Sequence, residues 1–432
     1  MSTPASASEV KGRWRHLIIA IICMILIANL QYGWSVFVAP LTKAVHGWDG
    51  SLQPKAVAAA VQFAFTFFVF LETWGTPVGG WFTDRIGPRF GPRTVVGVGG
   101  VLCALGWVIN ASAGSLTMLY VGNFLTGVGA GFVYCVCVGT AVKWFPDRRG
   151  LASGLVAGGF GAGAALTILP IDWVIKAHGY QAAFLWFGLF QGILVLIIAQ
   201  FLRHPNPGEV PAVASKANQQ SKNSYTTVQM LSSWVFWVLY VCDVLMCAGG
   251  LVIAANLKPL GVSYHHDTAI IVGMAALSLT LVLSNISNGV GRPIFGWISD
   301  KIGLPLAMVF SYGIGAVAYF FLAQFGANPW MFLLGILLVM FCWGNIFSLF
   351  PSMCTNIFGP KYATTNTSVL YTAKGTAALL VPLAGSLITM HVALQVCIAI
   401  NIVAVLIVWF ILRPAAIRFH VVDASKTVAQ PA

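Results

Sequence analysis

Charged residues are scarce in this sequence. Only 8% of its 432 residues are Asp, Glu, Lys or Arg, whereas 58% are hydrophobic. A soluble globular protein has about a quarter of its residues charged. The composition therefore excludes that class and indicates an integral membrane protein.

Acidic residues are the scarcest of the charged ones, with 11 Asp and Glu against 23 Lys and Arg. A basic excess is typical of nucleic-acid binding when Lys and Arg cluster on a solvated face. Here they lie between apolar runs instead. Membrane topology therefore explains the excess, and no nucleic-acid partner is expected.

The sequence also lacks the spacing typical of a disulfide framework or a zinc site. The nine cysteines all fall inside apolar segments, at Cys23, Cys103, Cys135, Cys137, Cys242, Cys247, Cys342, Cys354 and Cys397. We expect them to be small packing residues. His265, His266 and Asp267 are types that bind metals, but three consecutive residues in a loop do not easily converge on one ion. Since no nucleophile, base and oxyanion donor are visible either, we expect no metal, no cofactor and no enzymatic activity.

A cleaved signal peptide is not predicted. Residues 11–28 begin like one, but the apolar run continues to Ala39 without a small-residue cleavage pattern. The run is therefore read as the first membrane span. A span needs about 20 mostly apolar residues. Twelve can be placed, at residues 17–39, 56–82, 94–113, 116–142, 150–173, 181–202, 234–257, 268–298, 304–326, 329–352, 364–389 and 392–412.

A polar segment separates the sixth and seventh spans. Residues 203–233 are rich in Pro, Ser, Asn and Gln, which is typical of a flexible linker. The predicted fold is an all-α membrane protein with twelve transmembrane helices in two pseudo-symmetric six-helix halves. Its predicted parts are an N-terminus at 1–16, a half at 17–202, the linker at 203–233, a second half at 234–412 and a C-terminus at 413–432.

The distribution of positive charge predicts the orientation. With the N-terminus in the cytoplasm, 17 of the 23 Lys and Arg lie on the cytoplasmic side, and four lie outside, at Lys43, Lys55, Lys176 and Lys258. The other two, Arg292 and Lys374, lie inside spans. The positive-inside rule selects this orientation. We predict a multi-pass monomer in the lipid bilayer of the cell inner membrane, with both termini cytoplasmic.

A short motif occurs twice, half a chain apart. Its copies are Gly80, Asp84, Arg85 and Gly87, and, 216 residues later, Gly296, Asp300, Lys301 and Gly303. We expect the first glycine to allow a neighbouring helix to approach closely. We expect the aspartate to cap or salt-bridge a helix end that separates from its partner during transport. A repeat of this period predicts a transporter built from two related halves.

The two intramembrane cations lie deep in their spans. Lys374 is 13 residues after Lys361 and 17 before His391, so a rise of about 1.5 Å per residue places it near the middle of the bilayer. Arg292 is about 12 Å from Asp300 by the same rise. A charge at that depth costs at least about 2.5–3.5 kcal/mol and is tolerated where it faces a wet cavity or a partner. The pair therefore predicts a site for a small anion.

The two cations differ as donors. The guanidinium of Arg292 is a planar fork that can hold one carboxylate by two parallel hydrogen bonds, and the ammonium of Lys374 is a compact charge that can bind a second carboxylate. A dianion with two carboxylates matches both cations, whereas a monoanion satisfies only one.

The sequence resembles a known family. Its twelve spans, polar linker and paired motif resemble those of the major facilitator superfamily. Within it, the residues that resemble the oxalate:formate antiporter family are Gln31-Tyr32-Gly33-Trp34, the run from Trp144 to Gly154, Arg292-Pro293 and Ala373-Lys374. The resemblance extends from Arg13 to Arg413. It implies exchange of oxalate for formate, with substrate contacts from Gln31, Tyr32, Tyr134, Trp343 and Lys374.

Two aromatic residues complete the predicted cavity. Phe347 lies four residues after Trp343, and Tyr371 lies three residues before Lys374, so each pair shares a helix face. Aromatic walls limit the volume of a cavity and exclude water from it. Phe347 departs from the family pattern, where a tyrosine is expected, so one expected hydrogen bond to substrate is missing.

Two acidic residues leave alternatives open. Asp243, in span 7, is a candidate structural partner for one of the cations. Glu72, in span 2, is a second candidate partner, and it stands where the family has a neutral amide. An acid in a membrane helix is a usual ingredient of proton coupling. A proton-coupled mono- or dicarboxylate symporter, with Glu72 or Asp243 as the proton carrier, is therefore the alternative to the antiporter.

The predicted mechanism is alternating access, in which the two halves rock around a site at the bilayer midplane. Closing this site empty would bury two uncompensated cations, whereas closing it on a dianion would not. This difference predicts exchange rather than net flux, with oxalate entering as formate leaves.

Overall fold

The computed structural model describes residues 12–48, 50, 53–145, 149–206, 209–210, 225–359, 362–383 and 389–415. These residues are mainly helical. Most of the predicted termini and of the predicted linker lies outside this part of the chain, so those domain boundaries stay predictions.

The first half of the chain contains eight α-helices in its described part. They are α1 (Arg13–Tyr32), α2 (Trp34–Trp48), α3 (Pro54–Trp74), α4 (Thr76–Ile86), α5 (Gly91–Ala111), α6 (Leu116–Trp144), α7 (Arg149–Gly163) and α8 (Ile168–Ala199), with the short 3-10 helix η2 (Ala164–Leu166) between the last two. The predicted first and second spans are each two helices in line, which meet at Gly33 and at Gly75.

The second half follows the same plan. Its elements are α9 (Thr227–Leu231), α10 (Trp234–Ser263), the hairpin strands β1 (Ile270–Ile271) and β2 (Met274–Ala275), α11 (Ala276–Ile302), α12 (Leu304–Phe325), α13 (Pro329–Gly344), α14 (Ile346–Phe358), α15 (Ala363–Ala378), η3 (Val381–Leu383), α16 (Met390–Ile407) and η4 (Val408–Leu412). The start of α13 is fixed by Asn328, whose side chain accepts from the backbone N–H groups of Trp330 and Met331.

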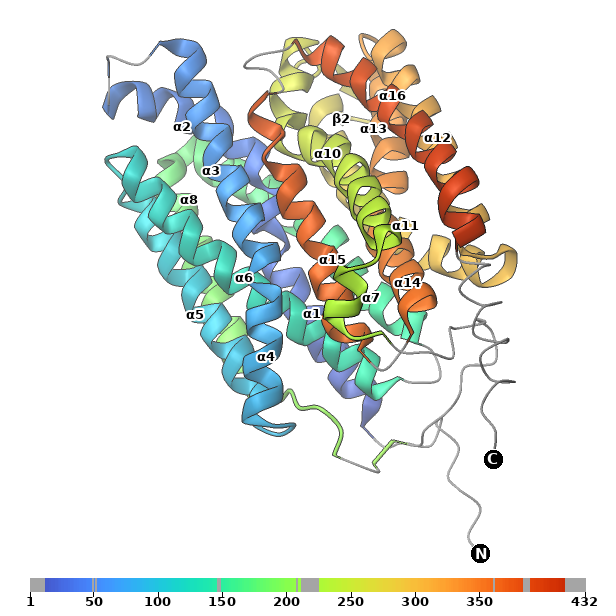
Figure 1. Cartoon of the computed structure of the whole chain (residues 1–432). Helices are drawn as coiled ribbons and strands as arrows, with labels where there is room; N and C mark the ends of the chain where they lie inside the picture. The colour runs from blue at the N-terminus through green and yellow to red at the C-terminus, as the bar shows by residue number, and fades with distance from the viewer. Residues whose placement is uncertain are drawn as a thin grey trace, which may run out of the picture.

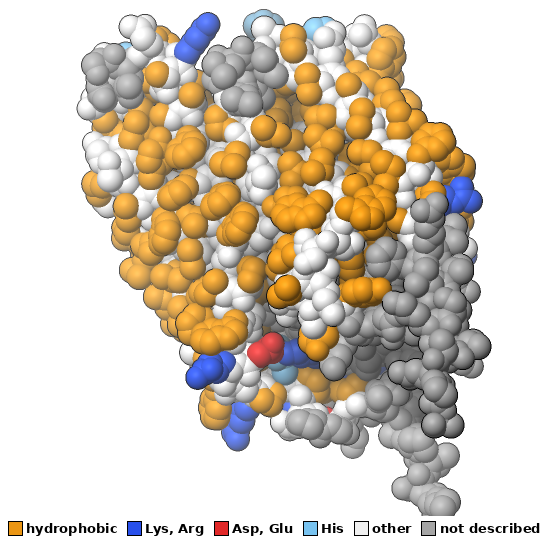
Figure 2. Space-filling view, viewed as in Figure 1, with side chains coloured by type: hydrophobic (Ala, Val, Ile, Leu, Met, Phe, Trp, Pro, Cys, Tyr) orange, Lys and Arg blue, Asp and Glu red, His pale blue; other side chains and the backbone are white. Residues whose placement is uncertain are grey.

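Twelve spans result, as predicted. Nine helical stretches within the described residues are long and apolar enough to cross a membrane. One of them, Leu151–Ala199, contains two spans that meet at Gly179, where φ is 87°. The other two spans are α11 and α15, which carry the buried Arg292 and Lys374 and are less apolar. Figure 2 shows a face covered by hydrophobic side chains, with most Lys and Arg toward its ends, as a lipid-facing surface requires.

The two halves lie side by side. The helices of the first half, drawn blue to green, are mainly on the left of Figure 1, and those of the second half, yellow to red, are on the right. They meet where α7 packs against α11, α3 against α15, and α2 against α10. We call the end that carries α2 and the β1–β2 hairpin the upper end, and the end where α4 leads into α5 the lower end.

The motif glycines differ from the prediction. A Cβ at Gly80 or Gly296 would meet no heavy atom within 4 Å, so neither marks a close helix approach. The close approach is at Gly79, where a Cβ would lie 3.3 Å from the Cα of Phe132 on α6. Successive helical residues are about 100° apart around the axis, so the packed face passes through Gly79 rather than its neighbour.

The other motif residues lie at the lower end. Gly87 and Gly303 end α4 and α11 with φ values of 102° and 86°, which favour glycine. Asp84 forms an ion pair of 2.8 Å with Lys143 on α6. Arg85 and Lys301 each lie over a tryptophan of their own helix, Trp81 and Trp297. The side chain of Asp300 lies outside the described part, so its role stays a prediction.

Candidate functional site

Arg292 projects from α11 into the contact between the two halves. Its side chain is 1% exposed. Nη1 donates to the backbone oxygen of Ala157 on α7 at 2.6 Å, and Nη2 donates to Tyr32 Oη on α1 at 3.1 Å. A weaker bond of 3.5 Å reaches Asn288 Oδ1, one turn earlier on α11. Arg292 therefore reaches from the second half to two helices of the first.

No acid among the residues that the structure describes balances the charge of Arg292. Its three hydrogen-bond acceptors are a carbonyl, a hydroxyl and an amide oxygen, all of them neutral. Its Nε is buried without a partner in the described part of the protein. The ring of Phe347 lies 4.8 Å from the guanidinium carbon, which gives a cation–π contact but no counter-charge. A buried cation in this condition attracts an anion.

Lys374 is bound very differently. Its Nζ lies 2.7 Å and 2.9 Å from the two carboxylate oxygens of Glu72 on α3, and 2.7 Å from Gln31 Oε1 on α1. Tyr371 Oη, one turn earlier on α15, lies 3.1 Å from both Nζ and Glu72 Oε1. Lys374 and Glu72 are 1% and 0% exposed. This buried ion pair joins the two halves.

The hypothesis that Asp243 pairs with one of the cations is wrong. Asp243 Oδ1 accepts a hydrogen bond of 3.4 Å from the thiol of Cys247, one turn later on α10. Glu72 reaches Lys374 directly across the boundary between the halves, so the acid that neutralises a cation comes from α3 rather than α10. Arg292 has no such partner in the described residues.

Aromatic rings surround the two cations. Tyr134 on α6 stacks on Tyr371 with ring centroids 4.8 Å apart, Tyr32 packs edge-on against Trp343 at 6.1 Å, and Phe347 lies 5.3 Å from Trp343. The indole N–H of Trp343 donates to the backbone oxygen of Cys247, so this donor is already engaged. The structure thus brings all eight predicted substrate residues to one place: Arg292, Lys374, Gln31, Tyr32, Tyr134, Trp343, Tyr371 and Phe347.

Three residues of the site escaped prediction. Phe160 on α7 contacts Tyr32 and Tyr134, and its ring centroid lies 5.4 Å from Lys374 Nζ. Asn288 and Ala157 contact Arg292 directly. One signal was available for Asn288, which precedes Arg292 by one helical turn. Ala157 acts through its backbone carbonyl, which every residue has, so its type carries no signal.

Glycines bring α7 and α11 together beside Arg292. A Cβ at Gly161 would lie 2.9 Å from the Cα of Gly289 and 3.1 Å from Arg292 Nη2. A Cβ at Gly289 would lie 2.6 Å from the Cβ of Ala162. The two helix axes therefore approach closely because both surfaces lack side chains at this crossing. This approach allows Arg292 to reach Ala157.

The halves are also bonded above the site. Lys258 on α10 forms an ion pair with Asp172 on α8. Gln62 on α3 donates to Asn256 on α10 at 2.9 Å, and Thr66 on the same helix donates to the backbone oxygen of Ala378 at 2.8 Å. Together with the burial of Arg292 and Lys374, these bonds close the route from the upper end.

A compact polar cluster lies at the lower end within the first half. Arg203 forms two hydrogen bonds with Glu209, of 2.6 Å and 2.7 Å, and these hold the pKa of the Glu209 carboxyl down at about 2. His204 Nδ1 lies 3.2 Å from Lys143 Nζ, which is itself paired with Asp84. Burial and the charge of Lys143 lower the pKa of His204 to about 3. The cluster joins α4, α6 and the segment after α8.

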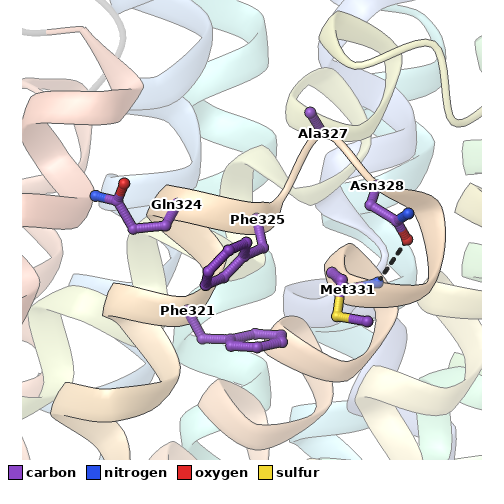
Figure 3. A pocket seen from close by; sticks show the side chains of 6 residues that line it. All are labelled: Phe321, Gln324, Phe325, Ala327, Asn328 and Met331. Atoms are coloured by element: carbon purple, nitrogen blue, oxygen red, sulfur yellow. Dashed lines mark hydrogen bonds between the residues drawn. The ribbon is translucent and has the colours of Figure 1, made fainter.

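The described residues contain no group of three or more His, Cys, Asp or Glu that could hold a metal ion. His266, from the cluster that the sequence suggested, bonds through Nε2 to the backbone oxygen of Gly326 at 2.8 Å. A shallow surface pocket lies at the turn between α12 and α13 and contains none of the predicted site residues (Figure 3). Its lining is Phe321, Gln324, Phe325, Ala327, Asn328 and Met331.

Comparison with known proteins places this geometry in a family. The chain matches the family model of the Major Facilitator Superfamily over residues 17–382 and 274–424. It is 35% identical to the oxalate:formate antiporter of Oxalobacter formigenes over 381 aligned residues. The aligned region covers 87% of this chain and 85% of that protein. It is 28% identical over 307 residues to monocarboxylate transporter 11 of Homo sapiens, over 70% of this chain and 60% of that protein.

A solved structure shows the same fold. The inward-open xylose transporter XylE from E. coli superposes with a TM-score of 0.72, covering 92% of this chain and 96% of that chain at 13% identity. At this identity the likeness concerns the fold alone. The family model shows that the chain belongs to the major facilitator superfamily, and the 35% identity shows that, within it, the chain belongs to the family of the oxalate:formate antiporter.

Proposed function

We propose that this protein is a secondary transporter that exchanges small carboxylate anions across the cell inner membrane, with oxalate entering as formate leaves. The observation that carries the proposal is the buried guanidinium of Arg292, whose hydrogen bonds go only to neutral oxygens. A bound carboxylate would supply the missing charge. The relatives named for oxalate, formate and monocarboxylates support a carboxylate as that anion.

Arg292 binds the first carboxylate in this proposal. Within the described part of the chain, its Nε has no partner, and its Nη2 donates to the Tyr32 hydroxyl and, weakly, to Asn288. A carboxylate that accepts from Nε and Nη2 satisfies the free donor and replaces neutral acceptors with a charged one. Charge-assisted hydrogen bonds are about twice as strong as neutral ones. The exchange of partners therefore favours the bound state.

Lys374 binds the second carboxylate of a dianion. In the closed empty site this lysine is occupied by Glu72, Gln31 and Tyr371. The second carboxylate of oxalate takes the place of Glu72, while the aromatic rings of Tyr134, Phe160 and Phe347 keep water out. Formate has a single carboxylate and is held by Arg292 alone.

The empty site holds fewer uncompensated cations than the sequence predicts. The sequence predicts two uncompensated cations in the empty site, but Glu72 neutralises Lys374 and leaves only Arg292. One unpaired buried cation still penalises closure of the empty carrier by several kcal/mol. The loaded carrier closes without this penalty. Exchange is therefore faster than return of the empty carrier.

The closed upper end fits alternating access. In the predicted orientation the upper end faces outside and the lower end faces the cytoplasm. The bonds between Lys258 and Asp172 and between Gln62 and Asn256 then form the outer gate. Oxalate enters after these bonds break, and formate enters from the lower end after α7 and α11 separate.

A proton-coupled symporter is the second candidate, and the ion pair of Glu72 with Lys374 favours it. A carboxylate tethered at the site can replace the second anion, and a protonated carboxylate can release Lys374 to substrate. Symport differs from exchange in one respect that can be measured, because it needs no anion inside.

The deciding experiment is uptake of labelled oxalate into proteoliposomes that contain formate, oxalate or buffer alone, each with and without an inward proton gradient. Exchange predicts uptake only where an anion is inside. Uptake into buffer-filled vesicles, driven by the gradient, would establish symport instead. Absence of oxalate and formate transport under every condition would overturn both candidates.

A further inference from the structure

We infer that Glu72 carries one proton during exchange, being protonated when the site holds the oxalate dianion and ionised when it holds the formate monoanion. The inference rests on the proposed function and deepens it. It assigns to Glu72 the role of matching the charge of the site to the charge of the substrate. Exchange of oxalate for formate is then electrically neutral.

The first step is the competition for Lys374. An ammonium group has three N–H donors, and four oxygens lie within 3.1 Å of Nζ, from Glu72, Gln31 and Tyr371. No donor of Lys374 is left for a substrate carboxylate while Glu72 is bound. A second substrate carboxylate can bind Lys374 only when Glu72 has released it.

The second step is the charge of the site. With Glu72 ionised, Arg292 and Lys374 leave one net positive charge, which one monoanion neutralises. With Glu72 protonated, the net charge is two positive, which one dianion neutralises. The opposite combinations leave a buried net charge, which is strongly unfavourable in a membrane protein. Only the two matched combinations allow the loaded site to close.

Glu72 lies among groups that suit this change. Lys374 and Tyr371 on α15 bond to it directly, Tyr371 stacks on Tyr134 of α6, and Arg292 on α11 bonds to Tyr32 of α1. With no anion bound, the two cations exceed the ionised carboxylate by one charge. Once a dianion is bound, an ionised Glu72 would leave one net negative charge buried in the site.

The proton has a defined route on this account. It comes from water on the side where oxalate binds, and it bonds to a carboxylate oxygen of Glu72 as the ion pair with Lys374 breaks. On the opposite side oxalate leaves, Glu72 returns to Lys374, and the proton passes to water. One oxalate dianion and one proton enter, one formate leaves, and each direction moves one net negative charge.

Two variants separate the states. Glu72→Gln fixes the site at two positive charges, so formate:formate exchange should fall at least tenfold more than oxalate:oxalate exchange. The double variant Glu72→Gln with Lys374→Gln fixes the site at one positive charge, so the order should reverse, with oxalate:oxalate exchange falling at least tenfold more. The double variant also removes the unpaired lysine, so it tests the inference if the single variant does not fold.

The measurement uses purified full-length protein in proteoliposomes filled with formate and a pH-sensitive dye, with the membrane potential set by potassium and valinomycin. For the wild type we expect one proton to enter per oxalate and a rate that does not change with potential. For Glu72→Gln, whose exchange with formate is slow, we expect no proton to enter per labelled oxalate taken up. Hydrogen oxalate would carry the same charge, so continued acidification by this variant would place the proton on the substrate and overturn the inference.

Asp243→Asn is the matched control, because Asp243 is a buried carboxyl group that, among the described residues, accepts from the thiol of Cys247 and pairs with no cation. It should acidify the vesicles like the wild type. Loss of acidification in Asp243→Asn and not in Glu72→Gln would overturn the inference. Wild-type exchange that moves no proton and changes with potential would also overturn it, while the proposed function would stand. The proposed function itself fails if the wild type moves neither oxalate nor formate, or if it takes up oxalate into vesicles that contain no anion.

Discussion

Lys258 on α10 and Asp172 on α8 form an ion pair between the two halves at the upper end. Asp172 has a second lysine partner at 2.9 Å, Lys176, which lies one turn later on the same helix. The side chain of Lys258 is 20% exposed and that of Lys176 is 71% exposed. Asp172 therefore has one partner that must separate when the upper end opens and one that stays with it.

Lys258→Gln should shift the protein toward a state that is open at the upper end. Loss of this partly buried ion pair destabilises the closed state by about 1 kcal/mol. The ratio of open to closed protein then rises about fivefold. The measurement is the rate at which a maleimide reagent labels a cysteine placed at Gln62, which is bonded to Asn256 in the closed state. We expect the cysteine variant that also carries Lys258→Gln to be labelled several-fold faster than the cysteine variant alone.

Lys176→Gln is the control for that experiment, since it removes a lysine from the same carboxylate without touching the second half. Labelling should stay near the rate of the parent protein. An equal acceleration by both variants would mean that Asp172 acts only within α8 and that the upper gate depends on other bonds.

Arg292→Lys and Lys374→Gln should both impair exchange, with different substrate dependence. Lysine cannot reproduce the fork of Arg292 or reach both Ala157 and Tyr32, so exchange of oxalate and of formate should fall about tenfold or more. Lys374→Gln removes the partner of the second carboxylate, so oxalate exchange should fall more than formate exchange. Both are measured in proteoliposomes beside Lys176→Gln as a reference. Undiminished oxalate exchange in both variants would rule out the two-cation site.

The spans and the two cations of the site could be predicted because each depends on local sequence. A run of about 20 apolar residues predicts a span wherever it stands, and Arg292 and Lys374 are conspicuous in such runs. The partner of Lys374 could not be chosen in this way. Glu72 lies 302 positions away in the other half, and the sequence offered Asp243 as an equal candidate. Only the packing of α3 on α15 decides between them.

The motif glycines show a second limit of sequence analysis. The repeated motif identified Gly80 as a small residue near a helix end. Neighbouring residues of a helix point about 100° apart, however, so the motif does not say which of them faces the next helix. The close approach falls on Gly79 instead. Along α7 the glycines do mark close packing, at Gly158 and Gly161 against Gly289 and at Gly163 against Ile25, because so many glycines cover several faces of the helix at once.

Gly289→Ala should disturb the crossing of α7 and α11. Its methyl group would lie 2.6 Å from the Cβ of Ala162 and 2.7 Å from the backbone oxygen of Gly158, so the helices must move apart. Overpacking of this kind costs about 1–3 kcal/mol. We expect a lower unfolding temperature and exchange reduced about tenfold, since Arg292 then loses its reach to Ala157.

Gly313→Ala on α12 provides the comparison, because a Cβ at that position meets no heavy atom within 4 Å. This variant should unfold at the wild-type temperature or slightly above it, since alanine favours a helix over glycine. Equal loss in the two variants would show that a methyl group added anywhere on these helices, rather than the α7–α11 crossing, sets the effect.

His204 should make the folded protein less stable as the pH falls below about 6.5. The side chain is 5% exposed. Its Nδ1 accepts from Lys143, and its Nε2 is buried without a partner in the described part. Burial and the nearby ammonium lower its pKa from 6.5 to about 3. Between these values the unfolded chain binds a proton that the folded protein does not.

The sign of the effect follows from linkage. Above pH 6.5 His204 is neutral in both states and does not contribute, and below it the unfolded state is favoured by up to about 1.4 kcal/mol per pH unit. His204→Gln keeps an acceptor for Lys143 but cannot titrate. Between pH 6.5 and 5 the unfolding free energy of this variant should therefore fall less than that of the wild type, by up to about 1.4 kcal/mol for each pH unit. Chemical unfolding in detergent measures it. Glu209 is held at a pKa of about 2, so its own contribution is lost only as pH falls below about 4.5. Burial lowers the pKa of His16 to about 4, so His16 contributes in the same window, but it does so in both proteins and cancels from the comparison. Equal slopes for the wild type and His204→Gln would mean that His204 is already protonated in the folded protein, and that Lys143 turns away from it.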